Sequence, residues 1–177
     1  PSINDPLAAR VFKTISEEHI GEMSFFRVYS GKVNAGDDLR NTTRNNSEKM
    51  RQIYFMNGKN RKDASQLIAG DIGAALKLKN THTGDTLADP KGPILLPKIN
   101  YPTPNMSYAV KPKARGDEEK IANGLAIMHE EDPTFLYRVD SELKQTIISG
   151  QGELHLNIAI KRISERFHVE LEKETPK

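Results

Sequence analysis

The sequence of 177 residues contains no cysteine and no tryptophan. The lack of cysteine excludes disulfide scaffolds, cysteine-ligated zinc or iron–sulfur sites, and cysteine nucleophiles. No apolar run approaches the length that a membrane span requires, so we expect no contact with a membrane. The sequence also shows no basic segment followed by an apolar one, the pattern of a secretory leader. Together these absences favour a cytoplasmic protein.

The composition is polar but globular, with 36% hydrophobic and 28% charged residues and a mean hydropathy of −0.62. The length fits one or two compact units. The net charge of +2 is too small to identify a partner by itself. Its distribution says more, because residues 1–92 carry a net charge of +3 and residues 93–177 a net charge of −1.

The basic residues of the first part concentrate between Arg40 and Lys62, where seven of them accompany Glu48 as the one acidic residue. Such a local excess favours a surface that faces phosphates. The residues that we expect to face a nucleic acid are Arg44, Lys49, Arg51, Lys59, Arg61 and Lys62. The alternative is a set of charged loops and strand edges that only keep the domain soluble. Tyr54 and Phe55, inside the run, either stack on bases or belong to the core.

A proline-rich segment divides the chain. Five prolines fall within residues 89–104. Proline lacks a backbone donor and fixes φ, so this stretch is neither a helix nor a central strand. We predict an extended linker over residues 93–105, between a domain at 1–92 and a domain at 106–177. The apolar residues 94–96 and Ile99 indicate that the linker packs along a surface.

Before the linker the pattern is that of short β-strands. Glycine and aspartate turn signals separate them, as in Asn34-Ala-Gly-Asp37 and Thr83-Gly-Asp85. In the second strand, Phe26 and Val28 fall on one face and Phe25 and Tyr29 on the other. The strands that we predict cover residues 7–15, 21–31, 49–56, 71–78 and 86–88. Short strands at this spacing indicate a small antiparallel barrel or sandwich.

After the linker the elements alternate between strands and helices. Asp117 is a favourable N-cap for the first helix, and Asp132-Pro133 ends it. Apolar residues recur with a helical period in both predicted helices. The predicted strands cover residues 106–111, 135–139, 145–149 and 169–172, and the second helix follows Gly152. The order βαββαβ predicts a ferredoxin-like domain, with two helices on one face of a four-stranded antiparallel sheet.

No motif for independent catalysis occurs in the chain. The phosphate-binding patterns GxxxxGK[ST] and GxGxxG and the metal-binding pattern HExxH are all absent. The five histidines are scattered, so we expect no metal site. The acidic group Glu130-Glu-Asp132 is interpreted as a solvated helix end in preference to an acid–base or metal site. The most distinctive string, Gly150-Gln-Gly-Glu-Leu-His155, is either a tight turn or a surface that contacts another domain.

Several strings resemble bacterial elongation factor G, and they occur in that family's order along essentially the whole chain. They are Phe25-Phe-Arg-Val-Tyr-Ser-Gly31, Ala69-Gly-Asp71, Thr83-Gly-Asp-Thr-Leu87, Glu131-Asp-Pro-Thr-Phe135 and Gln145-Thr-Ile-Ile-Ser-Gly-Gln-Gly-Glu-Leu-His-Leu156. The chain resembles domains II and III of that factor, which are the translation-factor β-barrel and the ferredoxin-like domain. The resemblance therefore implies the fold that the patterns indicate.

The resemblance also implies a role. Elongation factor G is a ribosome-dependent GTPase that moves tRNA and messenger RNA. GTP and Mg²⁺ would bind a nucleotide domain outside this chain, which would itself carry no cofactor, no metal and no catalytic residue. The implied partners are the ribosome, through 16S rRNA and small-subunit proteins, and the protein's own nucleotide domain.

The resemblance further implies a surface of the second domain that relays the nucleotide state and lies near the pocket for fusidane antibiotics. Its residues are Asp132, Gly150, Gly152, Glu153, His155 and Arg162. Positions 155, 159 and 162 share one side of a helix, so we expect them to form one contact patch. The sequence departs from the family pattern at Gln151, Asn157, Ala159 and Lys161.

Three alternatives remain at this stage. A ribosomal protection protein resembles the factor across the same two domains. A free-standing RNA-binding module would use the basic run alone. A reductase-type barrel would carry a flavin, although such a barrel has no need for the Gly-Gln-Gly-Glu-Leu-His string.

Overall fold

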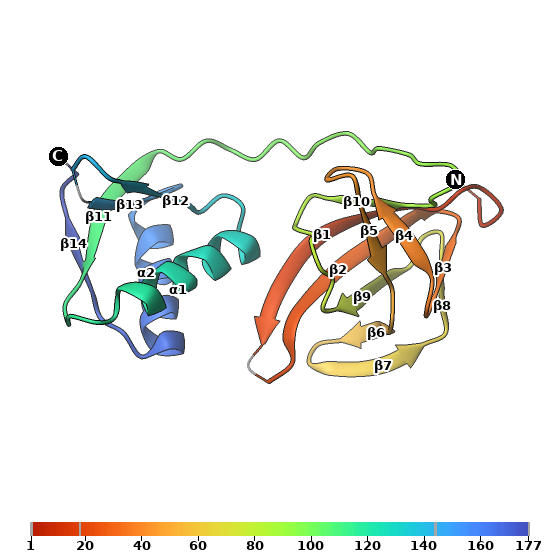
Figure 1. The fold of residues 1–177 in the computed structure, drawn as a ribbon, viewed down its shortest axis with the longest axis horizontal. Coiled ribbons are helices and arrows are strands. Elements are labelled where there is room, and N and C mark those ends of the chain that lie inside the picture. The colour runs from red at the N-terminus through yellow and green to blue at the C-terminus, as the bar shows by residue number, and fades with distance from the viewer. Residues whose placement is uncertain (1, 18, 144, 177) are drawn as a thin grey trace. The chain divides into compact units, whose positions relative to one another are not determined.

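The computed structural model describes residues 2–17, 19–143 and 145–176. The chain forms two compact units, Pro1–Ile99 and Asn100–Lys177 (Figure 1). The first unit consists of β-strands, and the second combines helices and strands. Among the described residues, no helix has both the length and the apolar character needed to cross a membrane.

The first unit is an antiparallel β structure. Its eight-stranded sheet has the order β5-β4-β10-β1-β2-β9-β6-β7, and β3 pairs with β8 separately. The strands are β1 (Ala8–Glu17), β2 (Gly21–Ser30), β3 (Lys32–Asn34), β4 (Asp38–Asn41), β5 (Asn46–Lys49), β6 (Ile53–Asn57), β7 (Asn60–Ala64), β8 (Gln66–Ile68), β9 (Ile72–Leu76) and β10 (Thr86–Ala88). Every pairing is antiparallel.

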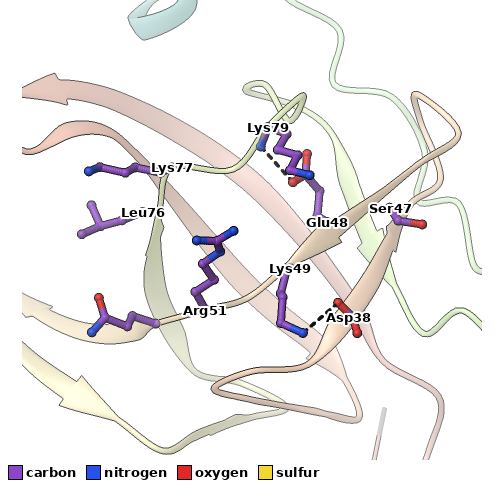
Figure 2. A pocket seen from close by; sticks show the side chains of 9 residues that line it. Asp38, Ser47, Glu48, Lys49, Arg51, Leu76, Lys77 and Lys79 are labelled. Atoms are coloured by element: carbon purple, nitrogen blue, oxygen red, sulfur yellow. Dashed lines mark hydrogen bonds and ion pairs between the residues drawn. The ribbon is translucent and has the colours of Figure 1, made fainter.

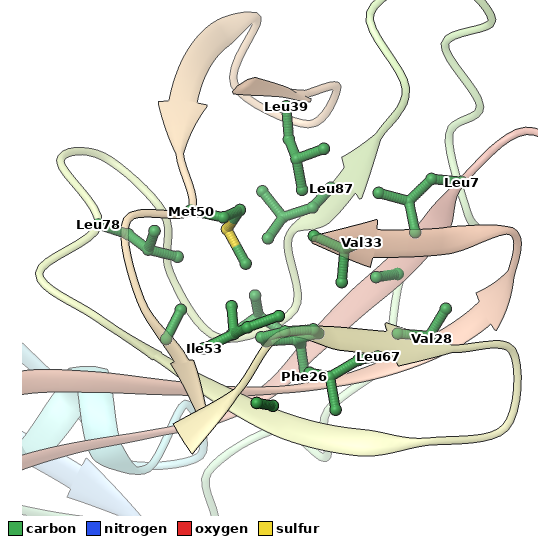
Figure 3. Close-up of a cluster of buried hydrophobic side chains, with 14 residues drawn as sticks. Leu7, Phe26, Val28, Val33, Leu39, Met50, Ile53, Leu67, Leu78 and Leu87 are labelled. Atoms are coloured by element: carbon green, nitrogen blue, oxygen red, sulfur yellow. The ribbon is translucent and has the colours of Figure 1, made fainter. Parts of the chain in front are cut away.

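The core of this barrel lies on the inner face of the strands. The predicted alternation in β2 is confirmed, because Phe26 and Val28 are buried while Arg27 and Tyr29 are exposed. Figure 3 shows side chains from β2, β4, β10 and the segment after β5 pointing toward one another. The buried cluster comprises Leu7, Ala9, Val11, Phe26, Val28, Val33, Leu39, Met50, Ile53, Ala64, Leu67, Ala75, Leu78 and Leu87.

One predicted strand of the barrel is wrong in its extent. The run 49–56 is not continuous, because β5 ends at Lys49 and β6 begins at Ile53. The backbone N–H of Met50 donates to Asp37 O, and Met50 O accepts from the N–H of Gly36. Met50 therefore pairs with the turn before β4, which interrupts the ladder. The strands β3, β4, β7 and β8 had no predicted counterpart.

The linker is extended and follows the surface of the barrel near residues 94–96 as predicted, although of its apolar side chains only Leu96 is half-buried. Residues 93–105 contain neither helix nor strand. Ile94, Leu95 and Ile99 are exposed. Backbone groups make the attachment instead, since Ile94 O accepts from the Thr42 hydroxyl at 2.9 Å and the Leu96 N–H donates to Thr86 Oγ1 at 3.3 Å.

The second unit confirms the predicted βαββαβ order. Its elements are β11 (Met106–Pro112), α1 (Glu118–Glu131), β12 (Leu136–Asp140), β13 (Gln145–Gly150), α2 (Glu153–Phe167) and β14 (Leu171–Glu174). The antiparallel sheet has the order β12-β13-β11-β14. Both helices share one core with the sheet, formed by Val110, Ile121, Leu125, Met128, Phe135, Ile148, Leu156, Ala159, Ile163, Val169 and Leu171. The fold class is therefore a small antiparallel barrel followed by a ferredoxin-like α+β domain.

Two details of this domain differ from the sequence-based expectation. Asp117 occupies the N-cap position of α1, but its carboxylate makes no cap hydrogen bond and accepts from Lys120 Nζ at 3.0 Å. The last strand begins at Leu171, two residues later than predicted. His168 ends α2 with a left-handed backbone conformation (φ 53°), and the Val169 N–H still bonds to Ser164 O, so neither residue can start the strand.

Candidate functional site

The barrel carries a hollow with a volume of about 590 Å³ beside β5 and the end of β9. Four cationic side chains line it and come from two separate segments (Figure 2). Lys49 and Arg51 come from β5 and the segment after it, and Lys77 and Lys79 come from the segment after β9. We call this site the basic hollow. Its other lining residues are Asp38, Ser47, Glu48, Gln52 and Leu76.

The two segments are fastened together by Glu48, whose side chain is only 2% exposed. Its carboxylate accepts from the backbone N–H groups of Lys79 at 2.9 Å and Asn80 at 2.7 Å. It also accepts from the Thr81 hydroxyl at 2.9 Å and the Asn46 amide at 3.1 Å. A buried carboxylate is stabilised by such donors. The carboxylate of Glu48 is therefore not part of the exposed lining, and it fixes the backbone at Lys79 and Asn80.

The basic hollow has a surplus of positive charge. Asp38 lies 3.5 Å from Lys49 Nζ, but both side chains are largely exposed, and such pairs contribute little energy. Within the described part of the chain, no carboxylate lies within ion-pair distance of Arg51, Lys77 or Lys79. These three cations are available to an external anion. A phosphate group suits them, because guanidinium and ammonium groups are its usual protein partners.

The structure divides the six basic residues that the sequence grouped together. Lys49 and Arg51 line the basic hollow. Arg44 instead serves the fold, because its Nε donates to the buried carboxylate of Asp85 at 2.7 Å. Arg44 is therefore an ion-pair partner of Asp85, but its side chain is still 41% exposed, so its contact with RNA stays a prediction.

The remaining three residues of that group lie on the hairpin of β6 and β7. In its register Met56 faces Arg61 and Phe55 faces Lys62, so successive residues of β7 project to opposite faces. The guanidinium of Arg61 lies 5.7 Å from the ring centroid of Tyr54, which is buried. Lys59 lies in the turn between β6 and β7. The predicted single patch is therefore divided between the basic hollow and the hairpin of β6 and β7. Of the two aromatic residues in the run, Tyr54 belongs to the core and Phe55 is exposed.

Sequence reasoning missed Lys77 and Lys79. They lie outside the basic run, in an alternating Leu76-Lys-Leu-Lys79 string whose two lysines are too few to mark a basic patch. Lys77 has a positive φ of 56°, which turns the chain out of β9. The hydrogen bonds to Glu48 then bring this segment beside β5. No local signal in the sequence marks that approach.

In the second domain, the side chain of His155 forms hydrogen bonds that link the turn before α2 to the end of α1. Its Nδ1 accepts a hydrogen bond from the backbone N–H of Gln151 at 3.0 Å. Because Nδ1 is an acceptor, Nε2 carries the proton in the neutral ring and donates to Asp132 Oδ2 at 3.0 Å. The predicted proximity of Asp132 and His155 is therefore present, and we call this arrangement the His155 turn.

The two glycines before α2, Gly150 and Gly152, differ in how closely other atoms approach them. A Cβ on Gly150 would lie 2.8 Å from His155 Nδ1 and 2.9 Å from a methyl of Leu156, so a side chain would disturb the ring. Gly152 is the N-cap of α2 with an extended backbone (φ 166°), and a Cβ there would meet no atom within 4 Å. Close packing thus requires the first glycine, whereas the second is not constrained sterically.

The predicted helical patch at positions 155, 159 and 162 meets the core at its middle member, which also belongs to the apolar stripe of the helix. Ala159 is buried in the core, whereas Arg162 is exposed and His155 is half-buried. Glu153 is exposed in the first turn of α2, where a carboxylate is favourable. Arg162 and the exposed edge of His155 share one side of α2, whereas Glu153, nine residues before Arg162, projects from the opposite side.

The carboxyl of Asp132 has a shifted pKa. Burial acts to raise the pKa of this group, but three favourable interactions outweigh it and the pKa is lowered. The Thr134 hydroxyl donates to Oδ1 at 2.6 Å, the Thr134 backbone N–H donates to the same atom at 2.9 Å, and His155 interacts with Oδ2. All of these stabilise the ionised form.

This shift predicts how the second domain responds to acid. A carboxyl whose pKa is lower in the folded than in the unfolded state stabilises the fold above its unfolded pKa, and this contribution is lost as the pH falls through the folded pKa. We expect Asp132→Asn to destabilise the domain at neutral pH and to have progressively less effect in acid. Urea unfolding at a series of pH values, followed by NMR signals of α2, measures this difference. A difference that stays constant with pH would contradict the assignment, and Asp140→Asn controls for the loss of one charge.

Comparisons with known proteins agree with this architecture. Residues 6–89 match the sequence model described as elongation factor G domain 2, and residues 101–175 match the one described as elongation factor G, domain III. The fold is also similar to a crystal structure of a protein from Thermus thermophilus, with a TM-score of 0.86 and 29% sequence identity. That match covers 98% of this chain and 26% of the Thermus chain, so this chain spans about a quarter of that protein's length.

Proposed function

The chain belongs to the elongation factor G family, with its second and third domains in the family's order, and we propose that it serves the ribosome-dependent movement of tRNA and messenger RNA. In this proposal GTP and Mg²⁺ bind a nucleotide domain of the whole protein. The two domains described above carry no catalytic residue and act in the cytoplasm, by contacting the ribosome and that nucleotide domain.

We assign the ribosome contact of the barrel to the basic hollow, in preference to the hairpin of β6 and β7, which carries Lys59 and Lys62 of the residues first expected to face RNA. The observation that carries this assignment is the set of three cations, Arg51, Lys77 and Lys79, which lack carboxylate partners among the described residues. The buried Glu48 holds the backbone of Lys79 beside them. Because the backbone of Lys79 is already fixed, binding a phosphate there does not have to order this segment, which lowers the entropic cost of binding. The proposed ligand is the sugar–phosphate backbone of small-subunit ribosomal RNA, and no base-specific contact is implied.

Binding of the chain to purified small ribosomal subunits tests this assignment. An exposed ion pair contributes up to about 1 kcal/mol, so losing two phosphate contacts in Arg51→Gln/Lys79→Gln is expected to weaken binding by about tenfold. The matched control is Lys59→Gln/Lys62→Gln, which removes the same charge from the hairpin of β6 and β7. Equal weakening by both double variants would mean that diffuse charge, and not the basic hollow, attracts the subunit.

We assign the relay of the nucleotide state to the His155 turn. Asp132 ends α1 and His155 lies in the first turn of α2, so their hydrogen bond joins the ends of two helices. A contact at the exposed edge of His155 would therefore be felt by both helices. In the whole factor, His155→Gln is expected to slow translocation while circular dichroism remains that of the folded protein. Unchanged translocation and unchanged ribosome-stimulated GTP turnover would remove His155 from the relay.

A further inference from the structure

The outer face of β1, β2 and β9 exposes three large apolar side chains. Phe12 is 41% exposed, Tyr29 45% and Ile72 51%. Together with Arg10 and Arg27 they line a hollow of about 260 Å³. We call these five residues the outer patch. Arg27 and Tyr29 also line a second hollow of similar volume beside Ala69 and Gly70, so they form a ridge between two depressions.

The two aromatic residues of the outer patch reach the surface through irregularities in the strands. In the pairing of β1 with β2, the register passes from Val11 directly to Lys13, and Phe12 has no partner. On β2, the register passes from Val28 to Ser30, and Tyr29 has no partner. Each aromatic is therefore the extra residue of a β-bulge. Bulges redirect a side chain at the cost of ladder hydrogen bonds, and they are common beside functional sites.

The two arginines of the outer patch face each other without a neutralising group. Arg10 and Arg27 are direct cross-strand partners, an arrangement that is unfavourable for like charges. Of the carboxylates in the described part of the chain, none lies within ion-pair distance of either guanidinium. Arg10 Nε is buried and has no hydrogen-bond partner. The guanidinium of Arg27 lies 5.5 Å from the ring centroid of Tyr29.

We propose that the outer patch binds a protein surface that presents a carboxylate between apolar side chains. A carboxylate accepts two parallel hydrogen bonds from a guanidinium and would neutralise the arginine pair. Tyrosine and arginine are the residues that most often dominate protein interfaces. The aliphatic side chain of Ile72 favours a protein partner over RNA, since nucleic acids offer few aliphatic groups to cover it. This site is separate from the basic hollow, with which it shares no lining residue.

NMR titration of the isotope-labelled chain tests the proposal with small probes. The probes are the capped tripeptides acetyl-Leu-Asp-Leu-amide and acetyl-Leu-Asn-Leu-amide and a short oligouridylate. We expect the aspartate peptide, at millimolar concentration, to shift the Nε–H signals of Arg10 and Arg27 and the ring signals of Phe12 and Tyr29. It should bind about fivefold more tightly than the asparagine peptide, because an exposed charge pair contributes up to about 1 kcal/mol.

Variants separate this site from the basic hollow. Arg27→Gln should abolish the preference for aspartate, and Phe12→Ser should weaken both peptides, whereas Lys77→Gln should change neither. The spectrum of each variant reports whether its fold is intact. Equal binding of the two peptides, no shift with either, or tighter binding of oligouridylate at these residues would overturn the proposal. The basic hollow would be unaffected by any of those results.

Discussion

Replacing Glu48 by alanine is expected to lower the free energy of unfolding of the barrel by at least about 3 kcal/mol. The carboxylate is buried and accepts hydrogen bonds from Lys79, Asn80, Thr81 and Asn46. Hydrogen bonds to a charged group contribute about 1.5–3 kcal/mol each, so losing even two of them reaches this value. The segment that carries Lys77 and Lys79 would also lose its attachment to β5.

Two further variants calibrate this result. Glu48→Gln keeps the shape of the side chain but replaces one acceptor by a donor, so an intermediate loss is expected. Asp38→Ala removes an exposed carboxylate from the same hollow and should cost little. Denaturant unfolding of the three variants measures the differences. Equal stability of Glu48→Ala and wild type would show that Glu48 does not hold the hollow together.

Gly31→Ala is expected to destabilise the barrel by about 2–5 kcal/mol. Gly31 has a φ of +70°, and a left-handed backbone costs other residues about 1–2 kcal/mol. A Cβ there would also lie 2.7 Å from Asp5 O and from the backbone of Leu7. These neighbours are backbone atoms and cannot rotate away, so overpacking adds about 1–3 kcal/mol.

The matched control for this substitution is Gly36→Ala. Gly36 also has a positive φ, of +90°, but a Cβ there would meet no atom within 4 Å. Only the backbone cost of about 1–2 kcal/mol is expected. Thermal or denaturant unfolding compares the two. If Gly31→Ala proves no more costly than Gly36→Ala, the close approach of residues 5–7 to Gly31 does not contribute to stability.

The fold was predictable where periodicity extended over several residues. The alternation of β2 and the helical stripe of α2 each identify an element and its buried face. The strands that were not predicted contain only three to five residues each. The break at Met50 depends on hydrogen bonds to the turn before β4, and the delayed start of β14 depends on the backbone of His168. Neither cause leaves a pattern in the neighbouring sequence.

The candidate site was predictable only in part, for the same reason. The basic run identified Lys49 and Arg51, but the other half of the hollow comes from a segment some thirty residues away that Glu48 brings into place. Arg44 looked equivalent to them in sequence, and its partner Asp85 is equally remote. The resemblance to elongation factor G placed Asp132 and His155 on one surface, but it did not predict the hydrogen bond between them. Composition and spacing alone do not connect them.

The salt dependence of small-subunit binding tests the central claim, that the cations of the basic hollow contact RNA phosphates. Each phosphate contact adds about 0.7–0.9 to the slope of log affinity against log salt concentration. Arg51→Gln/Lys79→Gln should therefore flatten the slope by about 1.4–1.8 relative to wild type, whereas Lys59→Gln/Lys62→Gln should leave it unchanged. An unchanged slope in the first double variant would contradict the claim.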